Sequence, residues 1–210
     1  TIREIHHRVK NNLQTVASLL RIQARRTKND QAKDALDQAM RRVAAIAVVH
    51  DTLSEGLSQN VDFDLVFNRV LKLVAELASA ASQVVQLNFQ GSFGFLPSQY
   101  ATPLALALTE LVTNAVEHGL RGKADGIVQI KATRAEGTLK VEVLDDGVGF
   151  VQGSSGEGLG TQIVKTLVLG ELAGAIEWGA PKNGLGARVT IEMPLTHLKK
   201  LPEVAQIPSL

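Results

Sequence analysis

The sequence predicts an α+β protein in which an N-terminal antiparallel two-helix hairpin precedes a two-layer α/β sandwich with a mixed sheet. The first 57 residues contain no proline and a single glycine, Gly56, whereas glycines are frequent beyond it. Apolar residues recur at intervals of three and four in this first part, which is the period of a helix. Alternation of apolar and polar residues follows later, as in strands, and the order of these segments favours a mixed sheet.

The hairpin is predicted from two apolar stripes separated by the polar residues 27–30. The first stripe consists of Ile2, Ile5, Val9, Leu13, Val16 and Leu20. The second consists of Leu36, Met40, Val43, Ala47 and His50. The break is short, so the two helices should be antiparallel neighbours. Two helices bury too little apolar surface to stand alone, and we expect a homodimer with a four-helix bundle.

The later segments predict the sandwich. Helical periodicity covers residues 65–80, 103–118 and 161–172. Strand-like alternation occurs around Val85-Leu87-Phe89, Val128-Ile130-Ala132, Leu139-Val141-Val143 and Val189-Ile191-Met193. We therefore expect a helical domain at 1–60, an α/β domain at 61–197 and a polar tail at 198–210.

Composition excludes several classes of protein. The 210 residues include no cysteine, which rules out disulfides and thiol chemistry. The net charge of +1 indicates no general attraction to nucleic acid or to a membrane surface. No apolar run approaches the roughly 20 residues of a membrane span, so we expect a cytoplasmic chain with no membrane contact in this fragment. Because residue 1 is Thr, we expect the chain to be part of a longer protein.

Two glycine-rich segments indicate a nucleotide site. Residues 145–149 (Asp-Asp-Gly-Val-Gly) follow a predicted strand, and residues 156–161 (Gly-Glu-Gly-Leu-Gly-Thr) precede a predicted helix. Glycines in such places let backbone N–H groups approach phosphate at a helix N-terminus. The dinucleotide fingerprint and the GKS/T phosphate loop are both absent. The alternative is that each segment is only a tight turn.

A polar stripe on the helix before them strengthens this interpretation. Glu110, Asn114 and His118 are spaced by four residues and share one face. A carboxylate, an amide oxygen and an imidazole in line suit Mg²⁺ and phosphate oxygens. A solvated helix face is the alternative for this helix taken by itself.

Together these segments resemble the GHKL ATPases. Residues 110–119 (ELVTNAVEHG) are similar to the N box, 145–149 to the G1 box, 156–160 to the G2 box, and Gly184-Leu-Gly186 with Thr190 and Pro194 to the closing segment. The resemblance implies ATP as the nucleotide, Mg²⁺ held at Asn114, and an adenine amino group accepted by Asp145. It further implies nucleotide contacts from Gly147, Gly149, Gly156, Gly158, Gly160, Thr161 and Thr190. The lysine that often follows the N-box asparagine is missing, which leaves His118, Arg121 or Lys123 as substitutes.

The first helix indicates the branch of that superfamily. Residues 4–13 (EIHHRVKNNL) resemble the phosphoacceptor motif of the HisKA_2 histidine kinases, which are related to the HWE kinases. The resemblance implies a sensor kinase core that phosphorylates its own histidine and passes the phosphoryl group to an aspartate of a response regulator receiver domain.

Helical phase selects between the two adjacent histidines. At about 100° per residue, His6 lies roughly 60° from the centre of the apolar stripe and His7 roughly 160° from it. A phosphoryl donor on another domain must reach an exposed imidazole, so His7 is the predicted phosphoacceptor. Glu4, on the adjoining face, is the predicted acceptor of its proton. Asn11, one turn on, either orients the phosphoryl group or is a simple surface residue.

Two alternative functions belong to other classes. An anti-sigma-type serine kinase would share the nucleotide site but has no use for a histidine-bearing hairpin. A non-catalytic nucleotide-binding scaffold would not need Glu110, Asn114, Asp145 and His7 together. We therefore predict a histidine kinase, with Glu110 joining His7, Glu4 and Asn11 in catalysis.

Overall fold

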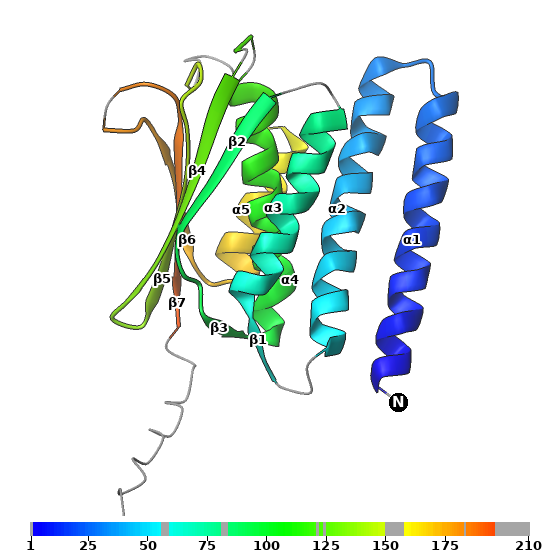
Figure 1. Ribbon diagram of the computed structural model, residues 1–210, viewed down its shortest axis with the longest axis horizontal. Helices are drawn as coiled ribbons and strands as arrows, with labels where there is room; N and C mark the ends of the chain where they lie inside the picture. The colour runs from blue at the N-terminus through cyan, green and yellow to red at the C-terminus, as the bar shows by residue number, and fades with distance from the viewer. Residues whose placement is uncertain are drawn as a thin grey trace, which may run out of the picture.

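The computed structural model describes residues 2–55, 59–80, 84–120, 122–123, 125–149, 158–182 and 184–195. The molecule is layered: a sheet, a layer of three helices on one of its faces, then α2, and finally α1 on the outside (Figure 1). Gly156 and the predicted tail at 198–210 lie outside the described residues. No helix in the described ranges combines the length and the apolar character needed to cross a bilayer.

The elements follow the predicted order. The helices are α1 (Ile2–Arg26), α2 (Asp30–Glu55), α3 (Phe63–Ala80), α4 (Ser98–Asn114) and α5 (Leu159–Thr166), with π-helical turns η1 (Ala115–Gly119) and η2 (Leu167–Glu171) continuing α4 and α5. The strands are β1 (Asn60–Asp62), β2 (Val84–Gly91), β3 (Phe95–Pro97), β4 (Asp125–Ala135), β5 (Thr138–Asp145), β6 (Ala175–Gly179) and β7 (Arg188–Pro194).

The main sheet has the order β2-β4-β5-β7-β6. The β2 and β4 strands are parallel, and every other pair in this sheet is antiparallel. The predicted mixed sheet is therefore confirmed. The short strands β1 and β3 form a separate antiparallel pair that leads into α3 and α4.

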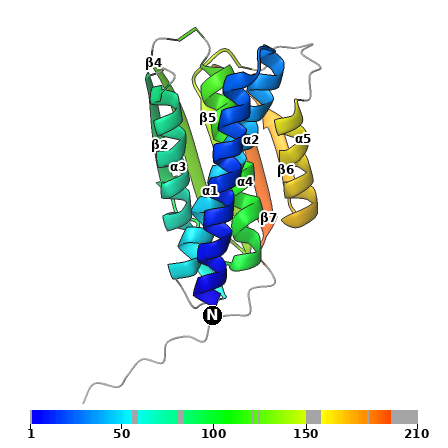
Figure 2. The same cartoon turned by 90° about the vertical axis from the view of Figure 1, so that its right-hand side faces the viewer.

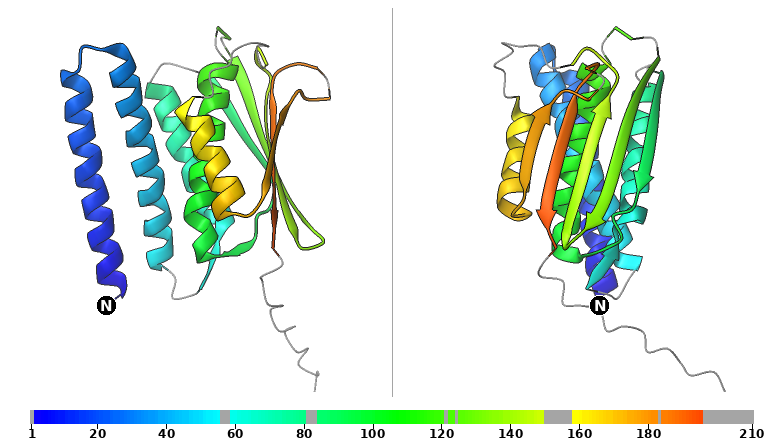
Figure 3. Two further views of the ribbon diagram at one scale, coloured as in Figure 1. Left: turned by 180° about the vertical axis from the view of Figure 1, so that it is seen from behind. Right: turned by 90° about the vertical axis from the view of Figure 1, so that its left-hand side faces the viewer.

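The core lies between the sheet and the three helices α3, α4 and α5, which all cover the same face. Its largest fully buried side chains are Phe63, Phe67, Phe93, Leu96, Leu104, Leu108, Leu120, Ile130, Leu139, Leu172, Ile191 and Met193. The opposite face of the sheet carries no helix (Figure 3). On that face, alternate positions such as Lys140 and Glu192 are exposed, which is the pattern of a sheet with one face packed on the core and the other in contact with solvent.

The hairpin is attached to this sandwich through α2, while α1 packs on the outer side of α2 (Figure 2). Helical phase gives α2 two contact faces. The predicted stripe from Leu36 to His50 is half-buried on one side, and Ala45, Val49 and Thr52 are buried about 180° away, against α3 and α4. The hairpin therefore packs on the second domain of its own chain.

The structure differs from the sequence-based expectation in the start of α4 and in three short strands. The helix expected to begin at Pro103 begins at Ser98 and contains Pro103 in its interior. Pro103 is the sixth residue of this helix, beyond the N-terminal positions whose N–H groups lack partners, so the helix forms there without one backbone hydrogen bond, to the carbonyl of Gln99. The strands β1, β3 and β6 were not predicted. The first two have three residues each, and only Ile176 and Trp178 alternate within the five residues of β6.

Candidate nucleotide site

A cavity of about 500 Å³ lies where the C-terminal end of α4, the turn after β5 and the N-terminus of α5 meet. Its lining includes Gln38, Arg41, Glu110, Leu111, Thr113, Asn114, Ala115, His118, Gly119, Val143, Asp145, Val148, Gly149, Gly158, Leu159, Gly160, Thr161, Trp178, Ala187 and Val189. Segments far apart in the chain, including the predicted N-box helix and both glycine-rich segments, therefore line one space.

Asp145 ends β5 and is one of two buried carboxylates in the lining of this cavity. Its side chain is held in place by the backbone, since the N–H groups of Gly147 and Ala187 donate to Oδ1 over 2.9 and 3.3 Å. Burial raises the pKa of Asp145 above its ordinary value, although these two hydrogen bonds act in the opposite direction. Within the described residues no hydrogen bond to Oδ2 is seen, so this oxygen can accept a donor from a ligand.

Three glycines allow the backbone to pack against Asp145. A Cβ atom at Gly119 would come within 2.7 Å of the Asp145 carboxylate. At Gly147 it would lie 1.7 Å from the Gly119 carbonyl oxygen, and at Gly186 it would lie 1.8 Å from the Asp145 carbonyl oxygen. Gly186 also has φ +83°, a conformation that side chains disfavour. These positions require glycine because the polypeptide itself forms the wall behind the carboxylate.

The N-terminus of α5 forms the opposite side of the cavity. Gly158 is extended at the N-cap, and the first residues of the helix, Leu159, Gly160 and Thr161, also line the space. The first N–H groups of a helix lack intrahelical partners and favour anions. Gly160 lies close to α4, because a Cβ atom there would be 2.7 Å from Glu110 Oε2. A phosphate group at α5 would therefore lie beside the predicted N-box helix.

The polar stripe of α4 faces this end of the cavity, as predicted. Glu110, Asn114 and His118 all line it. Glu110 is buried, His118 is exposed at the mouth, and Asn114 lies between them in exposure. The Glu110 carboxylate is paired with Arg42 of α2, at 2.7 Å from Nε to Oε1.

Three of the predicted nucleotide-binding residues do not line the cavity. Gly147 lies behind Asp145. Lys123 pairs with the Asp146 carboxylate at 2.5 Å on the outside. Thr190 pairs across the sheet with Glu142 and Glu177, and strand alternation directs it to the face opposite the cavity.

Several residues of the lining were not predicted from the sequence. Val189 holds the position in the cavity that was expected for Thr190, and it pairs with Val143. Trp178, the single tryptophan of the chain, lines the same side. Gln38 and Arg41 enter from α2. The alternation of β7 could have indicated Val189, whereas nothing in the sequence indicates that α2 reaches the cavity.

The predicted phosphoacceptor residues lie on α1, outside this cavity. His7, Glu4 and Asn11 are all exposed. Glu4 Oε1 accepts a hydrogen bond from Arg8 at 2.6 Å. The side chain of His6 lies outside the described part of the structure.

The chain matches known protein families over most of its length. Residues 71–179 match the histidine kinase-like ATPase domain, and residues 4–78 match the HisKA_2 family of histidine kinases. The first of these matches covers just over half of the chain, so the chain belongs to the histidine kinase-like ATPases. The HisKA_2 match precedes it and covers the N-terminal third of the chain.

Individual relatives agree with this assignment. The chain is 49% identical over 205 residues to the sensor histidine kinase PdtaS of Mycobacterium tuberculosis, a match that covers 96% of this chain and 40% of that protein. It is 46% identical over 199 residues to PdtaS of Mycolicibacterium smegmatis, covering 93% of this chain and 40% of that protein. The chain therefore spans about two fifths of the length of these curated relatives.

Solved structures share the fold. The histidine kinase domain of the blue-light-activated kinase EL346 from Erythrobacter litoralis matches with a TM-score of 0.65 and 23% identity, over 87% of this chain and 96% of that one. A longer structure of the same kinase matches with a TM-score of 0.67 and 26% identity, over 95% of this chain and 60% of that one. The helical hairpin and the mixed sheet thus belong to one known arrangement.

Proposed function

We propose that the chain is the kinase core of a two-component sensor, which uses ATP and Mg²⁺ to phosphorylate His7 and passes the phosphoryl group to an aspartate of a response regulator. One observation carries the proposal. Asp145, Asn114 and the N-terminus of α5 line a single cavity in a chain whose hairpin exposes His7.

The Asp145 end of the cavity suits adenine. The carboxylate has one oxygen fixed by the backbone and the other available to accept the adenine amino group. Val143, Val189 and Trp178 supply apolar surface beside it. A flat base with one exocyclic donor matches this combination of a fixed acceptor and apolar walls.

The opposite end suits a triphosphate with a divalent cation. The N-terminal N–H groups of α5 offer donors to phosphate oxygens. Asn114, one turn beyond Glu110, offers an amide oxygen, which is a ligand that Mg²⁺ accepts. The described residues include no cluster of three or more acidic or histidine side chains suited to a metal. Mg²⁺ would therefore take most of its ligands from phosphate oxygens and water, and it would neutralise charge on the transferring group.

His7 is the nucleophile of the proposed reaction. A ring nitrogen attacks the γ-phosphorus, a P–N bond forms, and the bond to the bridging oxygen breaks to release ADP. The attacking nitrogen is the one that carries no proton. The proton on the other ring nitrogen passes to an acceptor, for which Glu4 is the nearby carboxylate on the adjoining face. Asn11 would orient the phosphoryl group. None of the α1 side chains that the structure describes is part of the cavity lining, so transfer requires His7 and the cavity to approach each other.

The exposed side of α1 supports a homodimer. Ile5, Val16, Leu19 and Ile22 are between 43% and 61% exposed and share a stripe of about 120°. His7 lies about 130° from the centre of this stripe and about 110° from the side that faces α2. A second copy covering the stripe would leave His7 accessible to a catalytic domain and to a receiver domain.

Incubation with ATP labelled in the γ-phosphate and with Mg²⁺ tests the proposal. We expect label on the protein that is lost in acid and stable in base, because phosphohistidine has this lability. A cognate receiver domain, when added, should then take the label from the kinase. Acid-stable label would indicate the serine kinase instead. Nucleotide binding without any label would indicate a scaffold.

A further inference from the structure

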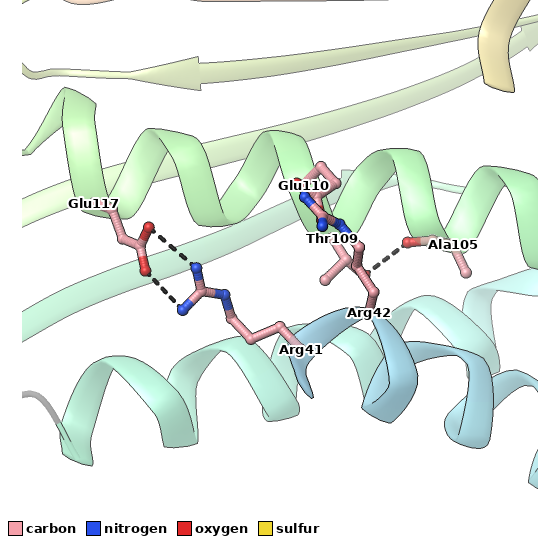
Figure 4. Close-up of polar contacts among 6 residues, drawn as sticks. All are labelled: Arg41, Arg42, Ala105, Thr109, Glu110 and Glu117. Carbon is pink, nitrogen blue, oxygen red and sulfur yellow. Dashed lines mark hydrogen bonds and ion pairs between the residues drawn. The ribbon is translucent and has the colours of Figure 1, made fainter. Parts of the chain in front are cut away.

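Two adjacent arginines of α2 join the hairpin to the predicted N-box helix (Figure 4). Arg42 makes a two-pronged contact with Glu110, at 2.7 Å from Nε to Oε1 and 3.2 Å from Nη2 to Oε2. Arg41 makes a second contact with Glu117, at 3.0 Å from Nη1 to Oε1 and 3.4 Å from Nη2 to Oε2. Glu110 and Glu117 are two turns apart, so both pairs lie along one line of contact.

These ion pairs are shielded from water to different degrees. The side chains of Arg42 and Glu110 are 16% and 9% exposed, and those of Arg41 and Glu117 are 18% and 38% exposed. Bidentate arginine–carboxylate pairs with little exposure are geometrically specific and weakly screened. The two pairs therefore fix one particular docking of α2 on α4.

The Arg42–Glu110 pair lies at the phosphate end of the nucleotide cavity. Glu110 lines the cavity, and a Cβ atom at Gly160 would be 2.7 Å from its Oε2 and 3.9 Å from Arg42 Nη2. While Arg42 holds both oxygens, the Glu110 carboxylate is neutralised and its oxygens are engaged. Glu110 is therefore withheld from the cation and the phosphate in this arrangement.

The same docking keeps His7 away from the cavity. Lys10 pairs with Asp51 at 2.7 Å, which places the N-terminal part of α1 beside the C-terminal part of α2. Asp51 is nine residues beyond Arg42, or about 14 Å along the helix. The N-terminus of α1 accordingly lies at one end of the molecule, and the C-terminal end of α4 points to the other (Figure 1).

We propose that Arg41 and Arg42 form an autoinhibitory latch, in which their pairs with Glu117 and Glu110 hold the catalytic domain against α2 with His7 out of reach. Opening the latch frees the Glu110 carboxylate and lets the cavity move to a phosphoacceptor histidine. This inference rests on the proposed kinase function. Arg41 lines the cavity, but both guanidinium groups already have carboxylate partners, and the partner of Arg41, Glu117, is outside the lining. These contacts favour a latch over a pair of phosphate-binding arginines.

Glu117→Arg tests the latch without altering a cavity residue. We expect the initial rate of autophosphorylation at saturating ATP to rise about fivefold, because loss of a partly exposed ion pair shifts a two-state equilibrium by about this much. The double variant Arg41→Glu/Glu117→Arg restores an ion pair of reversed polarity. Because Arg41 also lines the cavity, the KM for ATP of this variant is measured too, and at saturating ATP its rate should return toward the parent value. Glu192→Arg is the matched control, since it breaks the exposed Lys140–Glu192 contact of 4.0 Å on the far face of the sheet.

A distance measurement reports the docking independently of activity. The chain has no cysteine, so spin labels can be placed at Asp34→Cys on α2 and Thr133→Cys on β4, both exposed positions. We expect a single distance between the two labels in the otherwise unchanged protein. The distribution of this distance should be longer and broader in Glu117→Arg, and it should return to the first value in the double variant.

The possible outcomes separate the latch from the kinase function. An unchanged distance in Glu117→Arg overturns the latch. A shifted distance with an unchanged rate overturns its inhibitory role. In the double variant Arg41→Glu/Glu117→Arg, a lower rate together with a raised KM for ATP would identify Arg41 as a phosphate-binding group. That result would also overturn the latch. Absence of label from the parent and from every variant, with the distances shifting as expected, means that the proposed kinase function has failed and its inhibition with it.

Discussion

Gly119 lies directly against the carboxylate of Asp145, so that a Cβ atom at position 119 would be 2.7 Å from both Cγ and Oδ2. Gly119 ends the π-helical turn that continues α4, and Asp145 ends β5. The predicted N box and G1 box are thus joined by a contact for which only glycine leaves room. The orientation of the carboxylate proposed to bind the base therefore depends on a residue that itself has no polar side chain.

Gly119→Ala should therefore weaken ATP binding by about tenfold or more, because the displaced carboxylate loses its alignment with the base. Gly170→Ala is the control, since a Cβ atom there meets nothing within 4 Å. Isothermal titration with a non-hydrolysable ATP analogue would compare the two variants. Equal affinities would show that Asp145 is not positioned by Gly119.

Asp145→Asn should reduce ATP affinity by about ten- to a hundredfold, through loss of a charge-assisted hydrogen bond to the base. The single tryptophan, Trp178, lines the cavity, so its intrinsic fluorescence provides the titration signal. The thermal unfolding midpoint should not fall, because the parent carboxylate is buried at a cost in desolvation. An unchanged affinity would remove Asp145 from the site.

ATP binding should also depend on pH through Asp145. Burial raises the pKa of Asp145 above its ordinary value, and protonation of the carboxylate removes the charge that strengthens the hydrogen bond from the amino group to Oδ2. Affinity should be constant near neutral pH and fall as the pH drops through this raised pKa. Asp145→Asn should show only the titration of the nucleotide itself, which both proteins share. Identical pH profiles would contradict the prediction.

The second helix shows what its sequence could and could not predict. The apolar stripe from Leu36 to His50 correctly indicated a helix, and in the structure it occupies the side of α2 that faces α1. The opposite side contacts the α/β domain through the small residues Ala45, Val49 and Thr52 and through Arg41 and Arg42. Small and charged residues resemble a solvated surface in a sequence. Ion pairs between distant segments become recognisable only when their partners are known.

The residues of the cavity were likewise only partly predictable from the sequence. Motif order correctly brought Glu110, Asn114, Asp145 and Gly160 together, because glycines and polar residues at strand and helix ends leave a recognisable pattern. The side of the sheet on which a residue lies depends on register, and a shift of one residue exchanges the faces. This is why Val189, and not Thr190, lines the cavity.

Leu19→Glu should convert a dimer to a monomer. Leu19 is 58% exposed within the apolar stripe of α1, and a charge there would be buried without a partner in a bundle of two hairpins. Gln14→Glu places the same charge about 140° away on the helix and should leave the dimer intact. Light scattering over a range of concentrations measures both. A parent protein that is monomeric throughout would refute the proposed dimer.

His7→Gln should eliminate autophosphorylation, whereas His6→Gln should leave a measurable fraction of it. His7 is exposed on the face of α1 that also carries Glu4 and Asn11, and it projects away from both the α2 side and the exposed apolar stripe. An ATP-bearing domain can therefore bring the γ-phosphorus to about 3–3.5 Å from its ring nitrogen without unpacking the hairpin. The phase of His6 places it on the side of the hairpin seam, about 100° from His7.

The comparison of the two variants requires that both bind nucleotide as the parent does, which the fluorescence of Trp178 can establish first. Each is then incubated with labelled ATP and Mg²⁺, and the initial rate is measured. A reduced rate for His6→Gln is compatible with the assignment, because the substitution also changes the packing of the helix. Label on His7→Gln together with its loss from His6→Gln would make His6 the acceptor, and the argument from helical phase would be wrong. Full labelling of both variants with acid-stable phosphate would replace the histidine kinase by the serine kinase, since neither histidine would then be needed.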